Sequence, residues 1–310
     1  MSDDQLSADQ PFADQLFADR LAEIRQIRAY RPAAVAEAAA QRPRPATLSG
    51  ALPQPRGQLM IIAADHPARG SLGAGSQRLA MADRAGLLER LCTALRRPGV
   101  SGVLGTADVL EDLLLLGALD GKVVIGSMNR GGLAGAAFEI DDRFTGYDAA
   151  AIERMGFAGG KMLLRIDPAD PATAAALQAC AAAVSQLAGR QLLAMVEPFL
   201  AHRADGRLRN DLSAEAMTRA VAVAAGLGTT SAYTWLKLPV VADMDQVVAA
   251  STLPVLLLGG EVRRDPDAVF AGWRTALRLP NVRGIVAGRS LLYPPGGDVA
   301  GAVDTAVSLL

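Results

Sequence analysis

Lysine is scarce in this chain, and its few positions are the first sign of chemistry. The 310 residues include 31 Lys and Arg, of which only Lys122, Lys161 and Lys237 are lysine. A protein that uses arginine for ordinary surface charge keeps lysine where an amine must lose its proton and attack a carbonyl carbon. Lys161 and Lys237 also lie in apolar, strand-like stretches, where an unpaired ammonium is costly. We therefore expect these two lysines to be functional and Lys122 to be solvated.

Two carboxylates occupy comparable positions in the sequence. Asp65 follows the apolar stretch 59–64, and Glu197 lies within the stretch 192–199. A pair of carboxylates beside two amines can bind one lysine and supply acid–base function, while crowding favours the neutral form of the other amine. The structural alternative is a buried ion-pair network that only stabilises the fold. We favour catalysis, because all four groups fall at one end of the expected strands and buried charge is expensive.

Short apolar stretches alternate with helical stretches rich in Ala and Leu from about residue 58, which is typical of a parallel α/β sheet. The expected strands are 59–64, 100–105, 123–128, 161–166, 192–199, 233–240, 254–258 and 284–287. The expected helices are 77–96, 107–119, 147–155, 172–187, 214–225, 242–250 and 265–279. Eight strands with intervening helices predict a (β/α)8 TIM barrel. A doubly wound sheet is the rival, but Asp65-His66-Pro67 follows the first strand in place of Gly-x-Gly-x-x-Gly.

The chain divides into two parts. Residues 1–45 contain an amphipathic run and end at Arg42-Pro43-Arg44-Pro45, so we expect an N-terminal helical extension that is partly disordered at its start. Residues 46–310 form the expected barrel domain. The extension offers a surface for a neighbouring subunit, which leaves a homo-oligomer open.

Glycines follow the last two expected strands. The stretch 254–258 continues into Gly259-Gly260-Glu261, and the stretch 284–287 continues into Gly288-Arg289-Ser290. Barrel enzymes often bind a phosphate group after their seventh and eighth strands, where glycine lets backbone N–H groups approach the anion. We expect a phosphorylated substrate here, with Arg289 adding charge; the alternative is that these glycines only form tight turns.

A long polar loop after the third expected strand adds substrate-binding candidates. Asn129 and Arg130 are placed to bind hydroxyl or carboxylate groups of a substrate. His66, next to Asp65, is expected to bind substrate or relay a proton, with a structural hydrogen bond as the alternative. His202 is expected on a surface loop.

Composition excludes several classes of function. The net charge of -1 gives no electrostatic footprint for nucleic acid. No apolar run is long enough to span a bilayer and the start lacks a secretory signal, so we expect a cytoplasmic protein with no membrane partner. Because the chain has two histidines, we expect no metal site. An amine that attacks a carbonyl carbon forms an imine, and this reaction requires no cofactor.

The motifs at these positions resemble those of class I, Schiff-base aldolases of the deoxyribose-phosphate and tagatose-bisphosphate aldolase superfamily. The resemblance covers most of residues 58–292. Residues 236–240 look like the family's segment that carries the Schiff-base lysine, and residues 160–164 look like its second lysine segment. Residues 196–198 resemble its glutamate motif, and Asp65 falls where relatives keep an aspartate.

The resemblance implies a barrel aldolase in which Lys237 forms the imine. It also implies that Glu197 and Lys161 transfer protons and that Asp65 orients the amines or the substrate hydroxyls. The chain looks closest to a subgroup associated with inositol catabolism. This subgroup implies deoxyribose 5-phosphate or 2-deoxy-5-keto-gluconate 6-phosphate as the phosphorylated sugar, with Arg130 or Arg69 on the carboxylate of the latter.

Two other functions are also compatible with the sequence. A barrel sugar-phosphate isomerase or epimerase would use the lysines as bases and the same anion site. A non-catalytic sugar-phosphate binder would use the anion site alone.

Overall fold

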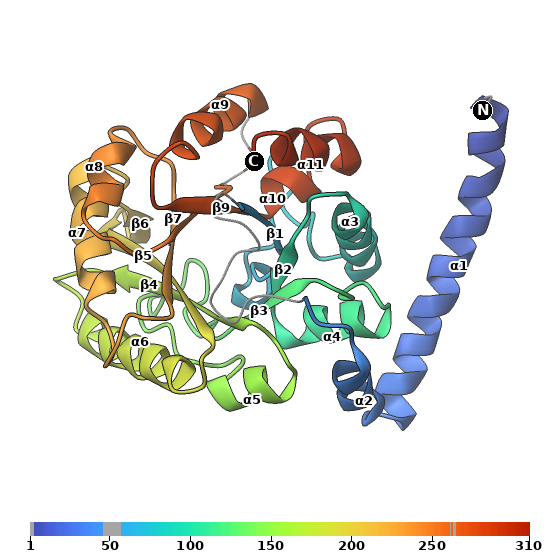
Figure 1. Ribbon diagram of the computed structural model, residues 1–310, viewed down its shortest axis with the longest axis horizontal. Helices are drawn as coiled ribbons and strands as arrows, with labels where there is room; N and C mark the ends of the chain where they lie inside the picture. Colours follow the sequence, from blue (N-terminus) through green and yellow to red (C-terminus); the bar gives the residue numbers. More distant parts are fainter. Residues whose placement is uncertain (1–2, 46–56, 261, 263–264) are drawn as a thin grey trace.

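A ring of parallel strands forms the centre of the molecule. The computed structural model describes residues 3–45, 57–260, 262 and 265–310, with the side chains of the first helix described from residue 15 onward. Within these residues, eight parallel strands close into a ring that helices surround (Figure 1). The barrel strands are β1 (Leu59–Ala63), β2 (Gly102–Gly105), β3 (Val123–Ser127), β4 (Gly159–Ile166), β5 (Leu193–Ala204), β7 (Thr234–Leu238), β8 (Val255–Leu258) and β9 (Val282–Ala287). The (β/α)8 barrel predicted from the sequence is confirmed.

Strand pairing determines which strands face each other across the barrel. The strands pair in the order β1, β2, β3, β4, β5, β7, β8 and β9, and β9 pairs with β1 to close the ring. In a ring of eight, β3 therefore lies opposite β8, and β4 lies opposite β9.

The two-residue period of the strands separates two hydrophobic layers. Leu59, Ile61 and Ala63 of β1 belong to the cluster inside the ring, whereas Met60 and Ile62 belong to the larger cluster between strands and helices. β2, β3, β5, β8 and β9 alternate between the two clusters in the same way, so the barrel interior is a packed core at its lower end.

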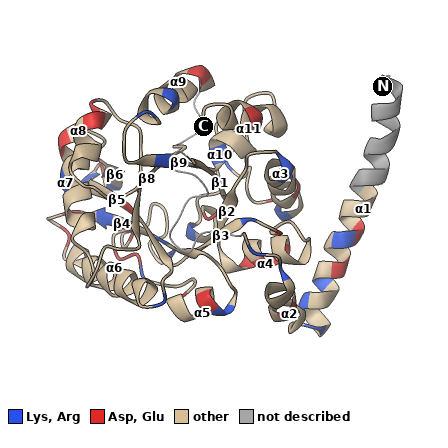
Figure 2. Cartoon of the chain, viewed as in Figure 1, with Lys and Arg blue, Asp and Glu red and all other residues tan. Residues whose placement is uncertain are grey.

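Helices connect successive strands on the outside of the ring. They are α3 (Arg84–Arg96), α4 (Ala107–Leu115), α5 (Ala149–Arg154), α6 (Ala172–Ala188), α7 (Ala214–Ala225), α8 (Met244–Ala249), α9 (Pro266–Ala276), α10 (Arg289–Leu292) and α11 (Val299–Val307), with a 3-10 turn η1 (Pro67–Arg69). The helix expected from residue 77 begins only at Arg84, because the Asp83 carboxylate accepts hydrogen bonds from the Ala85 and Gly86 N–H groups and fixes that start. α5 and α9 carry charges of both signs, whereas α6 carries none (Figure 2).

One strand was not expected from the sequence. β6 (Arg207–Asn210) pairs antiparallel with the end of β5, which continues to Ala204 rather than ending near Phe199. Asp205 and Gly206 join the two strands with φ angles of 52° and 71°, the left-handed backbone that a tight hairpin requires. His202 is exposed on this hairpin and not on a loop.

Two helices precede the barrel. α1 (Asp3–Tyr30) buries Leu21 and Ile24 in the core, and the Arg28 guanidinium pairs with Asp112 of α4 at 2.7 Å. α2 (Ala34–Gln41) leads to Arg42. The expected domain boundary at residue 46, like the first two residues of the chain, lies outside the described residues. In the described part of the chain, no helix has both the length and the apolar character needed to cross a membrane.

Arg42 ties this extension to the N-terminal end of the barrel. Its buried guanidinium donates hydrogen bonds to the carbonyls of Leu119, Lys122 and Gly156 at 3.1, 3.0 and 2.9 Å. We therefore expect Arg42→Ala to lower the free energy of unfolding by about 2–3 kcal/mol, because it removes charged donors from buried acceptors. Urea unfolding measures this change. Arg44→Ala, which removes an exposed arginine from the same segment, is the matched control; equal losses in both variants would contradict the assigned role of Arg42.

Candidate active site

Four buried ionisable groups form one continuous chain inside the barrel. The Lys237 Nζ lies 2.8 Å from Glu197 Oε1, and the Lys161 Nζ lies 2.5 Å from Glu197 Oε2. The Lys161 Nζ also lies 3.1 Å from Asp65 Oδ2. Glu197 is therefore shared by two lysines, and Lys161 by two carboxylates. The sequence singled out these four residues, and the structure brings them together.

Strand periodicity explains why they meet. Asp65 continues the inward-facing series 59, 61 and 63 of β1, and Glu197 continues the inward-facing Leu193 and Met195 of β5. β4 and β7 place Lys161 and Lys237 in the same interior. The polar groups thus lie above the apolar layer of the barrel.

Three further groups surround Asp65. The Arg130 Nη1 lies 3.2 Å from Asp65 Oδ2, and the Ser127 hydroxyl donates a hydrogen bond to the same oxygen at 3.1 Å. The His66 Nδ1 lies 3.7 Å from Asp65 Oδ1, beyond hydrogen-bond distance. Asp65 is 1% exposed, so these neighbours replace the water that its charge would otherwise require.

The chain of charges opens into a cavity of about 740 Å³. Its walls include segments that follow the strands: the turn after β1, the loop after β3, the β5–β6 hairpin and the turns after β7, β8 and β9. The cavity therefore occupies the C-terminal end of the barrel, where barrel enzymes carry their active sites. Its volume suits a small-molecule ligand.

Burial and neighbouring charge shift the ionisation of this group. Burial raises the pKa of Glu197, but the Lys161 and Lys237 ammoniums outweigh it and hold that pKa far below its ordinary value. Burial likewise opposes ionisation of Asp65, whose pKa is still held well below the ordinary value by Lys161, Arg130 and His66. Burial, and then the Arg130 guanidinium, lowers the pKa of Lys161. Both carboxylates are therefore ionised near neutral pH.

His66 is neutral under the same conditions. Burial lowers its pKa to about 3; the Asp65 carboxylate opposes this shift, and the Arg289 guanidinium adds to it. The imidazole lines the cavity, and its Nδ1 has no hydrogen-bond partner among the described residues. A neutral imidazole can accept or donate a proton within the cavity.

The glycines expected to bind phosphate line the cavity wall after β8 and β9, together with Arg289. Two of them are also required by packing. A Cβ at Gly288 would lie 2.2 Å from the Ala63 carbonyl oxygen, and one at Gly259 would lie 2.8 Å from the Ala287 Cβ. Gly260 has a φ of 67°, and a Cβ added there would meet no atom of the described residues within 4 Å. The phosphate site stays a prediction.

Asn129 has a different environment from the one expected. Its Nδ2 donates to the Leu163 carbonyl at 2.6 Å, and its Oδ1 accepts from the Leu163 N–H at 2.8 Å. It is 1% exposed and does not line the cavity. We therefore revise its assignment: Asn129 pairs with the β4 backbone, because its side chain points toward that strand and not toward the cavity.

Two buried charged residues of the cavity wall were not assigned a role from the sequence. Arg165 lies four residues after Lys161 on β4, and Glu139 comes from the loop after β3. Strand alternation would have revealed Arg165, because residues 161, 163 and 165 share one face. No local pattern reveals Glu139, whose position depends on how the loop folds over the barrel.

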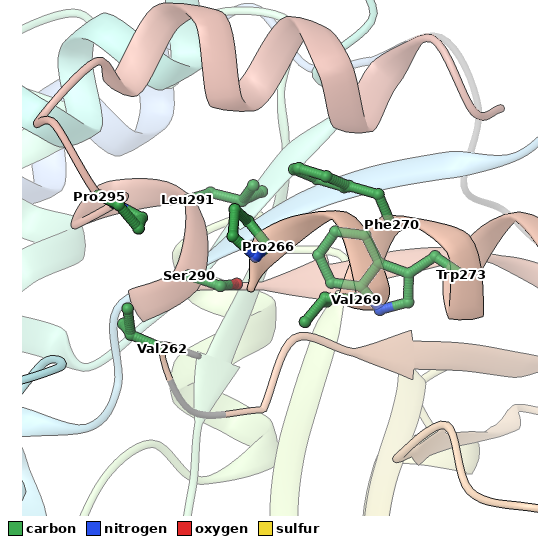
Figure 3. Close-up of a pocket in the computed structure, with 8 residues that line it drawn as sticks. All are labelled: Val262, Pro266, Val269, Phe270, Trp273, Ser290, Leu291 and Pro295. Carbon is green, nitrogen blue, oxygen red and sulfur yellow. The ribbon is translucent and has the colours of Figure 1, made fainter. Parts of the chain in front are cut away.

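A second hollow lies between α9 and α10. It measures about 20 Å³ and is lined mainly by apolar side chains, with the Ser290 hydroxyl on one side (Figure 3). This volume holds about one water molecule and no sugar. Among the described residues, no group of three His, Cys, Asp or Glu is arranged to hold a metal ion.

The lowered pKa of His66 predicts acid sensitivity. Between pH 6.5 and about 3, the unfolded chain binds a proton at this histidine that the folded protein does not bind, so the free energy of unfolding falls as pH falls below 6.5. We expect His66→Asn to reduce this slope between pH 6.5 and 5, by up to about 1.4 kcal/mol per pH unit. Urea unfolding at several pH values measures it. His202→Asn, on the exposed hairpin, is the control, and an unchanged slope in His66→Asn would refute the expectation.

Comparison with solved structures supports the fold and shows the family. A crystal structure of Cgl0159 from Corynebacterium glutamicum is 52% identical, with a TM-score of 0.90 over 94% of this chain and 96% of that chain. An archaeal fructose 1,6-bisphosphate aldolase is 17% identical, with a TM-score of 0.61 over 82% of this chain and 94% of that chain.

A fructose-bisphosphate aldolase from Slackia heliotrinireducens is 14% identical, with a TM-score of 0.59 over 82% of this chain and 85% of that chain. At these identities the two aldolases share the barrel fold with this chain. No curated protein matches the sequence significantly. The family described as Cgl0159-like matches residues 57–307. The chain therefore belongs to the Cgl0159-like family.

Proposed function

We propose that this protein is a class I aldolase, a lyase that cleaves or forms a carbon–carbon bond of a phosphorylated keto or deoxy sugar through an imine on Lys237. The observation that carries this proposal is the sharing of the buried Glu197 between Lys237 and Lys161 in a ligand-sized cavity. The barrel fold shared with Schiff-base aldolases supports it.

The ion pairs favour Lys237 over Lys161 as the nucleophile. Lys161 pairs with both Glu197 and Asp65, so loss of its proton would weaken two buried pairs. Lys237 pairs with Glu197 alone, and Glu197 would keep Lys161 as its partner after Lys237 became neutral. Attack by Lys237 would therefore break one buried ion pair, whereas attack by Lys161 would break two.

The reaction follows from these positions. The Lys237 amine adds to the substrate carbonyl, and the carbinolamine loses water to give a protonated imine. A base removes the proton of the substrate hydroxyl, the carbon–carbon bond breaks, and its electron pair moves into the imine to form an enamine. Protonation of the enamine and addition of water then release the second product and the free lysine. Glu197 and Lys161 transfer the protons, and Asp65 orients Lys161.

The substrate assignment extends this proposal. Gly259, Gly260, Gly288 and Arg289 would bind its phosphate group at the mouth of the cavity. Deoxyribose 5-phosphate and 2-deoxy-5-keto-gluconate 6-phosphate are the two candidates, and the second corresponds to a role in inositol catabolism. An isomerase or epimerase at the same site would use lysine as a base and would form no covalent bond to it.

Borohydride trapping tests the imine. We expect sodium borohydride to reduce a covalent adduct onto Lys237 when substrate is present, and mass spectrometry of peptides to locate it. Lys237→Met should abolish trapping, whereas Lys122→Met, which removes the third lysine of the chain from outside the cavity, should leave it intact. An adduct on Lys161 would exchange the roles of the two lysines. Turnover without any adduct would favour an isomerase or epimerase.

Glu197→Gln tests proton transfer by the shared carboxylate. The amide keeps the shape of the side chain but carries no charge, so we expect kcat to fall about 10²–10⁴-fold. Steady-state kinetics measure this, with melting temperature as a check on folding. Glu153→Gln, on the exposed face of α5, is the matched control. A kcat within a few-fold of the parent value would exclude the role assigned to Glu197.

A further inference from the structure

A second group of charges lies at the cavity mouth. We call Arg69, Arg130 and Arg165 the arginine cluster. The Arg69 Nη2 lies 2.5 Å and the Arg165 Nη1 lies 3.0 Å from the same oxygen, Oε1 of Glu139. All four side chains line the cavity, and Arg130 and Arg165 are 5% and 7% exposed. The proposed imine chemistry uses none of these three guanidiniums as a reactant.

The arginine cluster has more donors than the nearby carboxylates satisfy. Glu139 pairs with two of the three arginines, while Arg130 pairs with Asp65, which also binds Lys161. Among the described residues, the buried Arg69 Nε and Arg130 Nη2 have no hydrogen-bond partner. A buried guanidinium donor without an acceptor is costly. An anion in the cavity would satisfy such donors.

The charge of the whole cavity also favours binding of an anion. The described lining residues include six Lys and Arg, which are Arg69, Arg130, Lys161, Arg165, Lys237 and Arg289. They include three Asp and Glu, which are Asp65, Glu139 and Glu197. Burial is the main cause that lowers the pKa of Arg165 to about 10; the neighbouring Arg69 adds to this shift, and Glu139 and Asp142 oppose it. The lining residues thus carry three more positive than negative charges, and the buried carboxylate of Asp142, close to Arg69 and Arg165, offsets one of them.

Topology separates the arginine cluster from the predicted phosphate site. Arg165 and Arg130 belong to β4 and to the loop after β3, and these strands lie opposite β9 and β8 in the ring. Gly260 and Arg289 follow β8 and β9. Lys161 lies deeper than Arg165, which is four residues, or about 13 Å, further along β4. Arg130 reaches the level of Lys161, because both contact Oδ2 of Asp65. A ligand bound to Lys237 would therefore meet a cationic wall on each side.

We infer that the arginine cluster is a second anion-binding subsite, which holds an acidic group at the substrate end opposite the phosphate. This inference rests on the proposed function and narrows its substrate class to sugars with an anionic group at each end. The second group is a carboxylate or a phosphate, because a guanidinium binds either through two parallel hydrogen bonds. A sugar with one phosphate leaves the arginine cluster without a ligand.

Calorimetric binding to Arg165→Met tests the subsite. The ligands are deoxyribose 5-phosphate with one anionic group, 2-deoxy-5-keto-gluconate 6-phosphate with a carboxylate and a phosphate, and fructose 1,6-bisphosphate with two phosphates. We expect the variant to bind one of the two doubly anionic sugars about 10–100-fold more weakly than the parent protein. Binding of deoxyribose 5-phosphate should change less than about threefold. Which doubly anionic sugar binds tightly to the parent identifies the second group as carboxylate or phosphate.

Arg203→Met is the matched control. Arg203 donates a hydrogen bond at 2.6 Å to the carbonyl of Ala137, in the loop after β3, and it pairs with Asp170. It does not line the cavity. We expect it to bind all three sugars like the parent protein. If Arg165→Met does not fold, Arg69→Met carries the same test, because that side chain lies on η1 and is more exposed.

Two results would overturn the subsite: equal weakening of singly and doubly anionic sugars in Arg165→Met, or no binding of either doubly anionic sugar to the parent protein. Every protein in this binding experiment also carries Lys237→Met, so binding is measured without turnover and the result separates the two proposals. Selective loss in Arg165→Met together with an absent imine would retain the subsite and reject the aldolase. An imine on Lys237, together with equal weakening of all three sugars in Arg165→Met, would retain the aldolase and reject the subsite.

Discussion

The site depends on one buried carboxylate, Glu197, that is shared between two lysine amines. Burial alone would favour the neutral acid, yet two ammoniums within hydrogen-bond distance keep Glu197 ionised. This sharing lets one amine lose its charge without leaving the carboxylate unpaired, which an isolated buried pair does not allow. Asp65 and Arg130 extend the chain and hold Lys161 in place. Reactivity and stability are therefore linked through the same ion pairs.

The barrel geometry brings Glu197 and the two lysines within contact of one another. Asp65 and Glu197 come from strands that face each other across the ring, and Lys161 and Lys237 come from strands on either side of β5. Asp65, Glu197 and Lys237 point inward because each lies an even number of residues from an apolar residue of its own strand that packs inside the ring. A register shift of one residue in any of these strands would turn its charged group toward the helices. The two apolar layers fix the register, because that shift would also exchange the side chains inside the ring with those that pack under the helices.

The segments outside the ring complete the cavity. The β5–β6 hairpin contributes Leu208 and Asn210 to the wall. Close packing holds the loop after β3, since a Cβ at Gly132 would lie 2.4 Å from the Glu139 carbonyl oxygen. This packing places the Glu139 carboxylate between two arginines. At the other end of the barrel, Arg42 binds the carbonyls that follow α4 and α5. The mouth of the barrel is thus shaped by loops, and Arg42 attaches the N-terminal helices to the turns at the opposite end.

The sequence by itself determined the barrel and the central charges, because both depend on local periodicity. Alternating apolar strands and helices specify the (β/α)8 order, and a lysine such as Lys237 in an apolar strand is conspicuous without any knowledge of its partners. Tertiary structure alone decided the environment of the loop residues. Asn129 turned to the β4 backbone, Glu139 entered the cavity, and β5 continued into a hairpin. Loop conformation depends on contacts between segments distant in sequence, which no local pattern encodes.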